Sequence, residues 1–254
     1  MAILEVENLK KIYTTRFGAQ KVQALGRVSF AVEQGEFVAI MGESGSGKTT
    51  LLNLLAAFDR PTDGEVRLNG KTLSSVPERE IAAFRRDNLG FVFQDFNLLD
   101  TFSLQDNIFL PLVLAGKGYP EMRERMLPIA RKLGIEGILE KYPYEVSGGQ
   151  KQRAAVARAL ITDPAMVLAD EPTGALDSRA ADELMRLFGE INRGGQTVLM
   201  VTHSTRAASH ASRVLFIKDG EVFHQIYRGA SDDGELYQKI AGALTLMATG
   251  GDRR

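Results

Sequence analysis

A glycine-rich stretch early in the chain has the residue types and spacing of a phosphate-binding loop. Residues 42–49 read Gly-Glu-Ser-Gly-Ser-Gly-Lys-Thr, which matches the pattern G-x-x-x-x-G-K-[ST]. Glycines let such a backbone curl until its N–H groups point at phosphate oxygens, and the helix that follows adds its positive N-terminal end. Lys48 would neutralise the β- and γ-phosphates, and the Thr49 hydroxyl would coordinate Mg²⁺. The predicted nucleotide contacts are Gly42, Glu43, Ser44, Gly45, Ser46, Gly47, Lys48, Thr49 and Thr50.

A pair of acids forms the second candidate site. Asp170 and Glu171 directly follow the apolar residues 166–169. A buried strand rarely ends in paired carboxylates unless they manage a cation or a proton. Asp170 would hold Mg²⁺ through water, and Glu171 would act as the general base that polarises the attacking water. An acidic helix cap is the simpler interpretation of the pair alone, but the phosphate-binding loop elsewhere in the chain favours the catalytic one.

A second anion-binding helix terminus is predicted at residues 147–150, which read Ser-Gly-Gly-Gln. A serine N-cap followed by two glycines exposes several backbone N–H groups at the start of a helix. One phosphate site in one domain does not need such a duplicate. From the residues alone, the alternative that residues 147–150 simply cap an ordinary helix, and bind no anion, therefore stays open.

These motifs must be positioned by the elements around them. Continuous apolar runs with helical segments between them predict parallel strands with crossover helices, at residues 37–41, 89–93, 165–169, 196–201 and 214–217. Residues 3–7 and 28–32 instead alternate apolar with polar side chains, as half-buried antiparallel strands do. The pattern from about 77 to 160 is mostly helical, and 49–58 and 234–247 are also predicted helices. The last few residues are predicted to be disordered.

Composition excludes several classes of protein. The chain has 254 residues, of which 44% are apolar and 25% charged, as expected of one large α/β domain. Its formal net charge of −1 gives no overall attraction to nucleic acid, and the absence of cysteine excludes disulfides and thiolate metal sites. No stretch approaches the roughly 20 apolar residues that span a bilayer, and the N-terminus lacks the features of a signal peptide.

Residues 146–153, Val-Ser-Gly-Gly-Gln-Lys-Gln-Arg, resemble the signature motif of the ABC ATPases, with valine where leucine is commoner. The family's other motifs follow in the family's order. Gln94 resembles the Q-loop glutamine, residues 174–177 resemble the D-loop, and His203 resembles the switch histidine. Tyr13 resembles the aromatic residue that stacks on adenine, with Phe17 as the alternative. One departure is Ser204, which stands after His203 where the family often has aspartate.

The resemblance implies roles that the separate residues could not. Gln94 would touch Mg²⁺ or the lytic water, and His203 would hydrogen-bond the γ-phosphate, so the implied catalytic residues are Glu171, His203 and Gln94. Two copies would bind two ATPs head to tail, each ATP also touching the other copy's signature motif. Contacts across this dimer are implied for Ser147, Gly148, Gly149, Gln150 and Asp177. ATP and Mg²⁺ are the implied cofactors, with Thr49, Gln94 and Asp170 holding the metal.

The implied fold is α/β: a single domain over residues 1–254 with a RecA-like P-loop NTPase core. An antiparallel β subdomain would cover the adenine side, and an inserted helical subdomain would occupy about 95–161. A C-terminal helix and tail would follow at about 234–254. The second partner would be an integral membrane permease, which would hold the chain at the cytoplasmic face of the membrane. A sensor histidine kinase, reached through the permease, is a further implied partner, and no nucleic acid is expected.

Four segments are similar to one group within the family, at residues 93–101, 141–143, 171–178 and 216–220. They resemble the Bce-type ATPases, which protect Gram-positive bacteria against cell-wall peptide antibiotics such as bacitracin. Lipoprotein-releasing or macrolide-exporting ATPases of the same branch are the alternative. A soluble ABC ATPase acting on nucleic acid is less favoured, because it needs a long coiled coil, two cassettes or a basic surface. The intact motif residues argue against a non-hydrolysing subunit.

Three apolar residues, Phe96, Leu98 and Leu99, follow Gln94 closely. They are compatible with the core of the helical subdomain. They are equally compatible with a partly exposed cleft that receives a helix of the permease. The sequence leaves both interpretations open.

Overall fold

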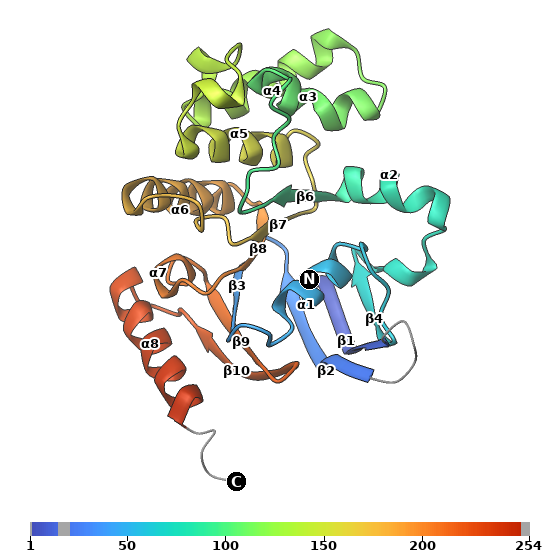
Figure 1. The fold of residues 1–254 in the computed structure, drawn as a ribbon, viewed down its shortest axis with the longest axis vertical. Helices are drawn as coiled ribbons and strands as arrows, with labels where there is room; N and C mark the ends of the chain where they lie inside the picture. Colours follow the sequence, from blue (N-terminus) through green and yellow to red (C-terminus); the bar gives the residue numbers. More distant parts are fainter. Residues whose placement is uncertain (1, 15–20, 250–254) are drawn as a thin grey trace.

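The computed structural model describes residues 2–14 and 21–249, which form two β-sheets and several groups of helices (Figure 1). The larger sheet has the strand order β10-β9-β3-β8-β7-β6. Its strands are β3 (Phe37–Met41), β6 (Leu89–Val92), β7 (Met166–Asp170), β8 (Thr197–Val201), β9 (Arg213–Lys218) and β10 (Glu221–Tyr227). All neighbours in it pair in parallel except β9 and β10, which form an antiparallel hairpin.

The parallel pairing brings the predicted motifs to one edge. The carboxyl ends of β3, β6, β7 and β8 meet there, because parallel strands of one sheet share a direction. The phosphate-binding loop follows β3, Gln94 follows β6, Glu171 follows β7 and His203 follows β8. Four motifs that are far apart in the sequence are therefore neighbours in the fold.

The smaller sheet is antiparallel, with the order β2-β1-β4-β5. Its strands are β1 (Ala2–Thr14), β2 (Lys21–Glu33), β4 (Asp63–Leu68) and β5 (Lys71–Thr72). Strands β1 and β2 are 13 residues long, much longer than the five-residue runs whose alternation predicts them. Register shifts interrupt the pairing of β1 with β2, and the alternation of side chains is lost at each shift.

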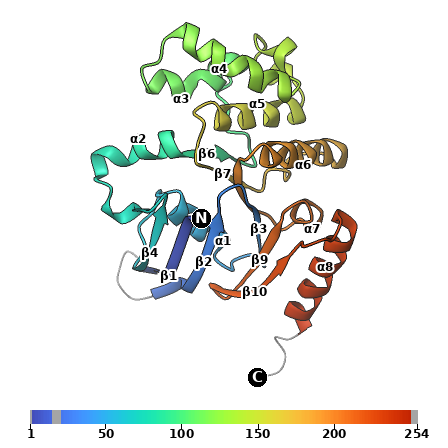
Figure 2. The ribbon, with the colours of Figure 1, turned by 180° about the vertical axis from the view of Figure 1, so that it is seen from behind.

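The helices fall into groups that can be recognised in two opposite views of the molecule. Helices α3, α4 and α5 lie together at the top of Figure 1, and the reverse view in Figure 2 shows the same group above the sheets. The helices are α1 (Lys48–Leu55), α2 (Glu78–Asn88), α3 (Leu104–Leu114), α4 (Tyr119–Lys132), α5 (Gly148–Leu160), α6 (Ser178–Arg193), α7 (Thr205–Ala208) and α8 (Asp233–Thr249). Short 3-10 turns lie at Leu73–Ser75, Glu136–Ile138 and Pro143–Glu145. Helix α1 is shorter than the predicted 49–58, because Ala57 has a left-handed backbone conformation with φ 52°.

The core has two parts, one on each face of the larger sheet. Successive side chains of β3 point to opposite faces, so Phe37, Ala39 and Met41 pack with the cluster that includes α3, α5 and α6. Val38 and Ile40 pack instead with α1 and the smaller sheet. Because β3 is buried on both faces, the loop that follows it starts from a rigid position.

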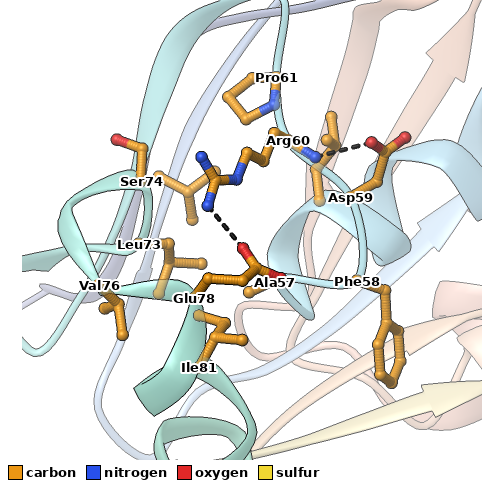
Figure 3. A pocket seen from close by; sticks show the side chains of 12 residues that line it. Ala57, Phe58, Asp59, Arg60, Pro61, Leu73, Ser74, Val76, Glu78 and Ile81 are labelled. Carbon is orange, nitrogen blue, oxygen red and sulfur yellow. Dashed lines mark hydrogen bonds and ion pairs between the residues drawn. The ribbon is translucent and has the colours of Figure 1, made fainter.

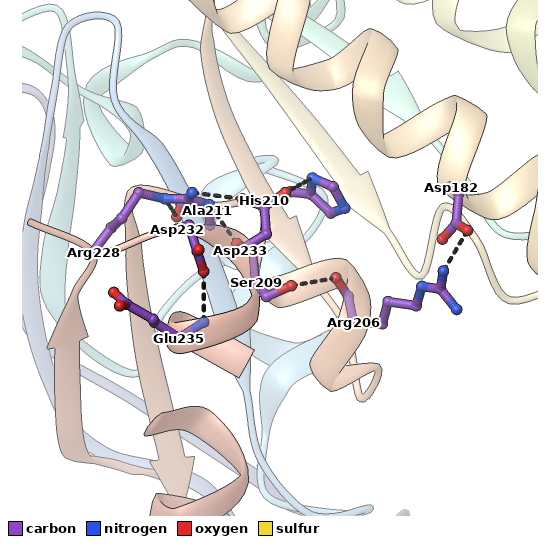
Figure 4. Close-up of polar contacts among 9 residues, drawn as sticks. All are labelled: Asp182, Arg206, Ser209, His210, Ala211, Arg228, Asp232, Asp233 and Glu235. Atoms are coloured by element: carbon purple, nitrogen blue, oxygen red, sulfur yellow. Dashed lines mark hydrogen bonds and ion pairs between the residues drawn. The ribbon is translucent and has the colours of Figure 1, made fainter. Parts of the chain in front are cut away.

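Helix α8 is attached to the segment after α7 by the polar contacts of Figure 4. Arg228 donates from Nε to the Ala211 carbonyl at 2.9 Å and from its guanidinium to Asp233 at 2.6 Å. His210 Nδ1 lies 3.1 Å from the other oxygen of Asp233, and burial lowers the pKa of this histidine. These contacts join the start of α8 to the segment after α7, the helix that follows His203.

In the part of the chain that the structure describes, no helix has both the length and the apolar character needed to cross a membrane.

Candidate nucleotide site

A cavity of about 440 Å³ opens at the carboxyl edge of the larger sheet. It is lined by most of the predicted phosphate loop, by the two acids at the end of β7, and by the predicted switch histidine. The residues that were predicted and that line it are Gly42, Ser44, Gly45, Gly47, Lys48, Thr49, Thr50, Asp170, Glu171 and His203. Three separate motifs thus meet around one space large enough for the phosphates of a nucleotide.

The phosphate loop depends on glycine at two positions. A Cβ on Gly42 would lie 2.2 Å from the Ile217 carbonyl oxygen, and one on Gly47 would lie 2.5 Å from the Ala24 carbonyl oxygen. Gly47 also has φ +99°, a left-handed conformation that other residues rarely adopt. The loop is therefore packed closely between β2 and β9, with its backbone facing the cavity.

Lys48 lies folded against the loop that it follows. Its Nζ donates to the carbonyl oxygens of Gly42 and Glu43, both at 2.7 Å. Burial lowers the pKa of Lys48, while the charges of Glu171 and Asp170 act in the opposite direction. A phosphate entering the cavity would replace these neutral acceptors with charged ones, which form stronger hydrogen bonds.

The site fits a magnesium nucleotide better than a metal ion alone. Among residues 2–14 and 21–249, no cluster of three or more His, Asp or Glu side chains could hold a metal by itself. Mg²⁺ commonly uses one or two protein ligands and takes the rest from phosphates and water. Thr49 and Asp170 line the cavity and could supply those ligands. The buried hydroxyl of Ser46, a loop residue that does not line the cavity, has no hydrogen-bond partner within the described residues.

The two acids differ in their surroundings. Burial, followed by the neighbouring Glu171 charge, raises the pKa of Asp170, and Lys48 only partly offsets this. Glu171 has a left-handed backbone with φ 45°, an unfavourable conformation of the kind that gathers at functional sites. Its Oε1 accepts from the His203 backbone N–H at 2.9 Å and lies 2.7 Å from His203 Nδ1. The sequence predicted both residues but not this direct contact.

Thr202 is a site residue that the sequence analysis missed. It is fully buried at the end of β8, and its hydroxyl donates to Glu171 Oε2 at 3.1 Å. Glu171 is thereby held at both carboxylate oxygens, by Thr202 and by His203. The Glu171 side chain is 15% exposed and that of His203 is 74% exposed, so the histidine side chain extends into the open cavity. Ser204, the departure from the family pattern, caps α7 by accepting from Ala207 N.

Gln94 and Tyr13 do not line the cavity. Gln94 packs against the predicted D-loop, so closely that a Cβ on Gly174 would lie 2.8 Å from Gln94 Cδ. Tyr13 belongs to β1 and pairs with Val22 of β2, which does line the cavity. Phe17, the alternative to Tyr13, lies outside the described residues.

The predicted signature residues form a second group. The Ser147 hydroxyl accepts from Gln150 N at 3.3 Å, and Gln150 Oε1 accepts from Ser147 N at 2.9 Å, so the start of α5 carries a full capping box. Gly149 lies against α6, where its Cβ would be 3.3 Å from that of Ala180. Asp177 caps α6 by accepting from Ala180 N at 2.9 Å. Ser147 to Gln150 and Asp177 are thus together, and none of them lines the 440 Å³ cavity.

Gln152 connects the two groups and was not predicted. This buried side chain donates from Nε2 to the Phe93 carbonyl at 3.1 Å and to the Pro172 carbonyl at 2.6 Å. Phe93 precedes Gln94, and Pro172 follows Glu171. Helix α5 is therefore tied to both the Q-loop and the segment of the proposed general base.

A second cavity, of about 490 Å³, lies between α2, α3, α5 and β6 and is mostly apolar. Its lining includes Phe58, Arg85, Arg86, Phe91, Phe93, Asn97, Leu110, Pro111, Leu114 and Arg158. The three apolar residues after Gln94 are not part of it. Leu98 packs against the core, Phe96 is half-buried, and Leu99 is 45% exposed. The core interpretation thus holds for Leu98, and the cleft is made by other residues.

The fold and the grouping of these motifs are those of an ATP-binding cassette ATPase. The chain belongs to the ABC transporter family, whose model matches residues 25–174. It is 49% identical to the ABC transporter ATP-binding protein YxdL of Bacillus subtilis, over 96% of this chain and 94% of the relative. It is 47% identical to the bacitracin export ATP-binding protein BceA of Halalkalibacterium halodurans, over 94% of each chain.

A solved structure is similar over most of the chain. It is the dimeric, post-hydrolysis state of the ATP-binding cassette MJ0796 bound to ADP and Pi, with a TM-score of 0.79 and 38% identity. The match covers 88% of this chain and 98% of that one. Dimerisation and a membrane permease as partner are therefore properties of the class to which this chain belongs.

Proposed function

We propose that this chain hydrolyses ATP to drive a permease that exports peptide antibiotics such as bacitracin, or otherwise protects against them. The observation that carries the ATPase part is the direct contact of Glu171 with His203 and Thr202 in the cavity that also contains Lys48. The likeness to BceA supports the peptide-antibiotic part. If the chain instead serves lipoprotein release or macrolide export, its permease would move a lipoprotein or a macrolide rather than a peptide antibiotic.

Most of the residues with a proposed role in hydrolysis line the cavity, whereas Thr202 and Gln94 do not line it. The loop N–H groups and Lys48 bind the β- and γ-phosphates, and bound Mg²⁺ would neutralise their charge. Glu171 accepts the proton of a water molecule as its oxygen attacks the γ-phosphorus, and ADP leaves. Thr202 and His203 hold the carboxylate in place, and the exposed imidazole of His203 is positioned to contact the γ-phosphate. Thr49, Asp170 and Gln94 are the proposed metal contacts.

A second copy completes the site. The signature residues Ser147 to Gln150 lie outside the cavity of their own chain, so we place them against the γ-phosphate held by the partner copy. Asp177 lies beside them and would form part of the same interface. ATP would join the two copies in a closed two-fold dimer, and hydrolysis would release them. Tyr13 would stack on the adenine.

The apolar cleft is the proposed docking site for the permease. Phe93 and Asn97 line it, and Gln94 lies between them in sequence and packs on Gly174. A segment inserted into the cleft would therefore press on the loop that leads to the nucleotide site and to the dimer interface. The positive charge of Arg85 in the lining favours an apolar helix with acidic residues, while Arg86 is already paired with Asp87. A chain docked in this way would lie at the cytoplasmic face of the membrane, and a sensor histidine kinase reached through the permease is a further proposed partner.

Docking can be tested with two leucines of similar exposure. Leu114 at the cleft is 68% exposed, and Leu246 on α8 is 71% exposed. In co-expression with the cognate permease, Leu114→Glu should lose recovery with detergent-solubilised membranes, and Leu246→Glu should retain it. Both variants should keep the ATPase activity of the isolated chain. Equal recovery of the two variants would place the permease elsewhere.

The antibiotic part is tested by bacitracin resistance in a strain that carries the permease with the active chain or with Lys48→Ala.

A further inference from the structure

The Asp59 carboxylate lies between the smaller sheet and the end of helix α1, and no motif predicted a role for it. Its Oδ2 accepts from the Tyr13 hydroxyl at 2.9 Å. Its Oδ1 accepts from Lys11 Nζ at 2.6 Å and from the Arg60 backbone N–H at 2.7 Å. Asp59 thus uses both oxygens to join two side chains of β1 to the turn that follows α1.

That turn belongs to the same rigid unit as the phosphate loop. The backbone N–H groups of Phe58 and Asp59 donate to the Asn53 carbonyl within α1, the helix that starts at Lys48. Figure 3 shows the turn beside a pocket, where Arg60 pairs with Glu78 of α2 at 2.7 Å. A group fixed to Asp59 is therefore fixed relative to the phosphates that Lys48 and its neighbours would hold.

Lys11 restricts the Tyr13 ring in a second way. Its ammonium lies over the ring at 4.9 Å from the centroid, and its own side chain is only 12% exposed. Lys11 also donates to the Arg60 carbonyl at 2.7 Å, so it is held by the same turn. One face of the ring is thereby occupied, and a base can stack only on the other face.

Stability alone does not account for these contacts. Tyr13 is 41% exposed, and a single hydrogen bond from such an exposed side chain contributes little to folding. Burial, followed by the hydrogen bond to Asp59, raises the pKa of the Tyr13 hydroxyl, which is the donor in this contact. The contacts fix the orientation of a side chain that buries little surface.

We propose that Asp59 is a positioning residue that orients the Tyr13 ring for stacking on the nucleotide base. This inference rests on the proposed nucleotide site and adds a residue to it. Asp59 acts before binding: a ring that is already oriented loses less conformational freedom when the base arrives. Asp59 should therefore change the affinity for the base-containing ligand and not the hydrolysis step.

The test compares two ligands, MgATP and the magnesium complex of inorganic triphosphate, which lacks the base. Asp59→Ala and Tyr13→Phe should each weaken MgATP binding by roughly 2- to 10-fold, the cost of ordering one more side chain. Asp59→Ala should leave triphosphate binding and kcat unchanged, so its effect appears in KM. Asp59→Asn keeps the shape and one of the two acceptor oxygens, so it should weaken MgATP binding less than Asp59→Ala does. Glu78→Gln, which breaks the other ion pair of the same turn, is the matched control and should bind both ligands normally.

Combining variants decides between positioning and a general structural role. In a Tyr13→Ala background, Asp59→Ala should have no further effect on MgATP binding, because the ring it orients is gone. A full additional loss in that background, or an equal loss of triphosphate binding, would overturn the proposal. Failure of the nucleotide site itself would be distinct, since the parent chain would then bind neither ligand.

Discussion

The N-termini of helices α1 and α5 are both proposed to bind phosphate, but they are prepared in opposite ways. Helix α1 starts after Gly47, and in the described part of the chain no side chain caps it. Helix α5 starts after Ser147, whose hydroxyl and backbone are both engaged by Gln150. The first terminus offers its N–H groups to a ligand of its own chain. In the second, the Gln150 N–H is already paired with the Ser147 hydroxyl, and its residues do not line the nucleotide cavity of their own chain.

This difference suggests an order of events. An anion stabilises a helix terminus most when the N–H groups there are unpaired. At a capped terminus the stabilisation is smaller, because the cap already satisfies part of those groups. Nucleotide should therefore bind first at α1 of each copy. The α5 terminus should contribute only when the partner brings its nucleotide, which makes dimerisation depend on bound ATP.

The largest expected effect comes from removing the charge at the α1 terminus. Lys48→Ala should abolish measurable ATPase activity and weaken MgATP binding. The reason is that the Lys48 ammonium lines the cavity and lies against the phosphate loop, where it would neutralise the phosphates. The fold should be retained, since the lysine donates only to loop carbonyls that have water as an alternative partner. ATPase assays, nucleotide titration and circular dichroism on the purified variant check the three parts. Turnover at the parent rate would remove the phosphate assignment.

The next effect separates catalysis from dimerisation. Glu171→Gln keeps the shape and a hydrogen-bonding group but cannot accept the proton, so the rate should fall by about 10²- to 10⁴-fold. Without the negative charge beside the γ-phosphate, the closed dimer should also persist. Size-exclusion chromatography should show a dimer with MgATP and a monomer with MgADP. Hydrolysis at the parent rate would remove Glu171 from the mechanism.

The sequence predicted most of the strands and motifs that depend on residues close together in the chain. The bounds of β3 matched the prediction, because every residue of that strand is buried and the run is continuously apolar. The loop residues 42–49 and the acids after residue 169 could be predicted from residue types, because the spacing within each motif is short, whereas the role of His203 was implied by the family resemblance. The lengths of β1 and β2 could not, because register shifts hide the alternation.

The residues that were missed have in common that their partners are distant in sequence. Thr202 is 31 residues from Glu171, Gln152 is 59 residues from Phe93, and Asp59 is 46 residues from Tyr13. No spacing rule within one motif connects such pairs. Their proximity follows from the order of strands in the sheet and from the packing of α5, which the sequence predicted only in outline.

A third prediction addresses the α5 terminus directly. In the Glu171→Gln chain, Ser147→Arg should abolish the ATP-dependent dimer, because a large side chain would occupy the place of the partner's γ-phosphate. Binding of MgATP to the monomer should change little, since Ser147 is not in the cavity of its own chain. Chromatography and nucleotide titration measure the two properties separately. A persisting dimer would show that the signature residues are not at the interface.

The smallest expected effect distinguishes the cap of α5 from its proposed contact with the partner. Ser147→Ala removes the hydroxyl that accepts from Gln150 N, and losing such a cap costs about 1 kcal/mol of folding stability. Ser147→Gly should cost less than half of that, because glycine is tolerated at this position of a helix. Thermal unfolding of the monomer should therefore rank the parent chain and the glycine variant above the alanine variant. Dimer formation in the Glu171→Gln background should follow a different order, with both variants weakened, because both lack the hydroxyl that would meet the γ-phosphate. If dimerisation instead followed the order of thermal stability, Ser147 would act through its own helix alone, and the contact across the dimer would have to come from the backbone of Gly148 and Gly149.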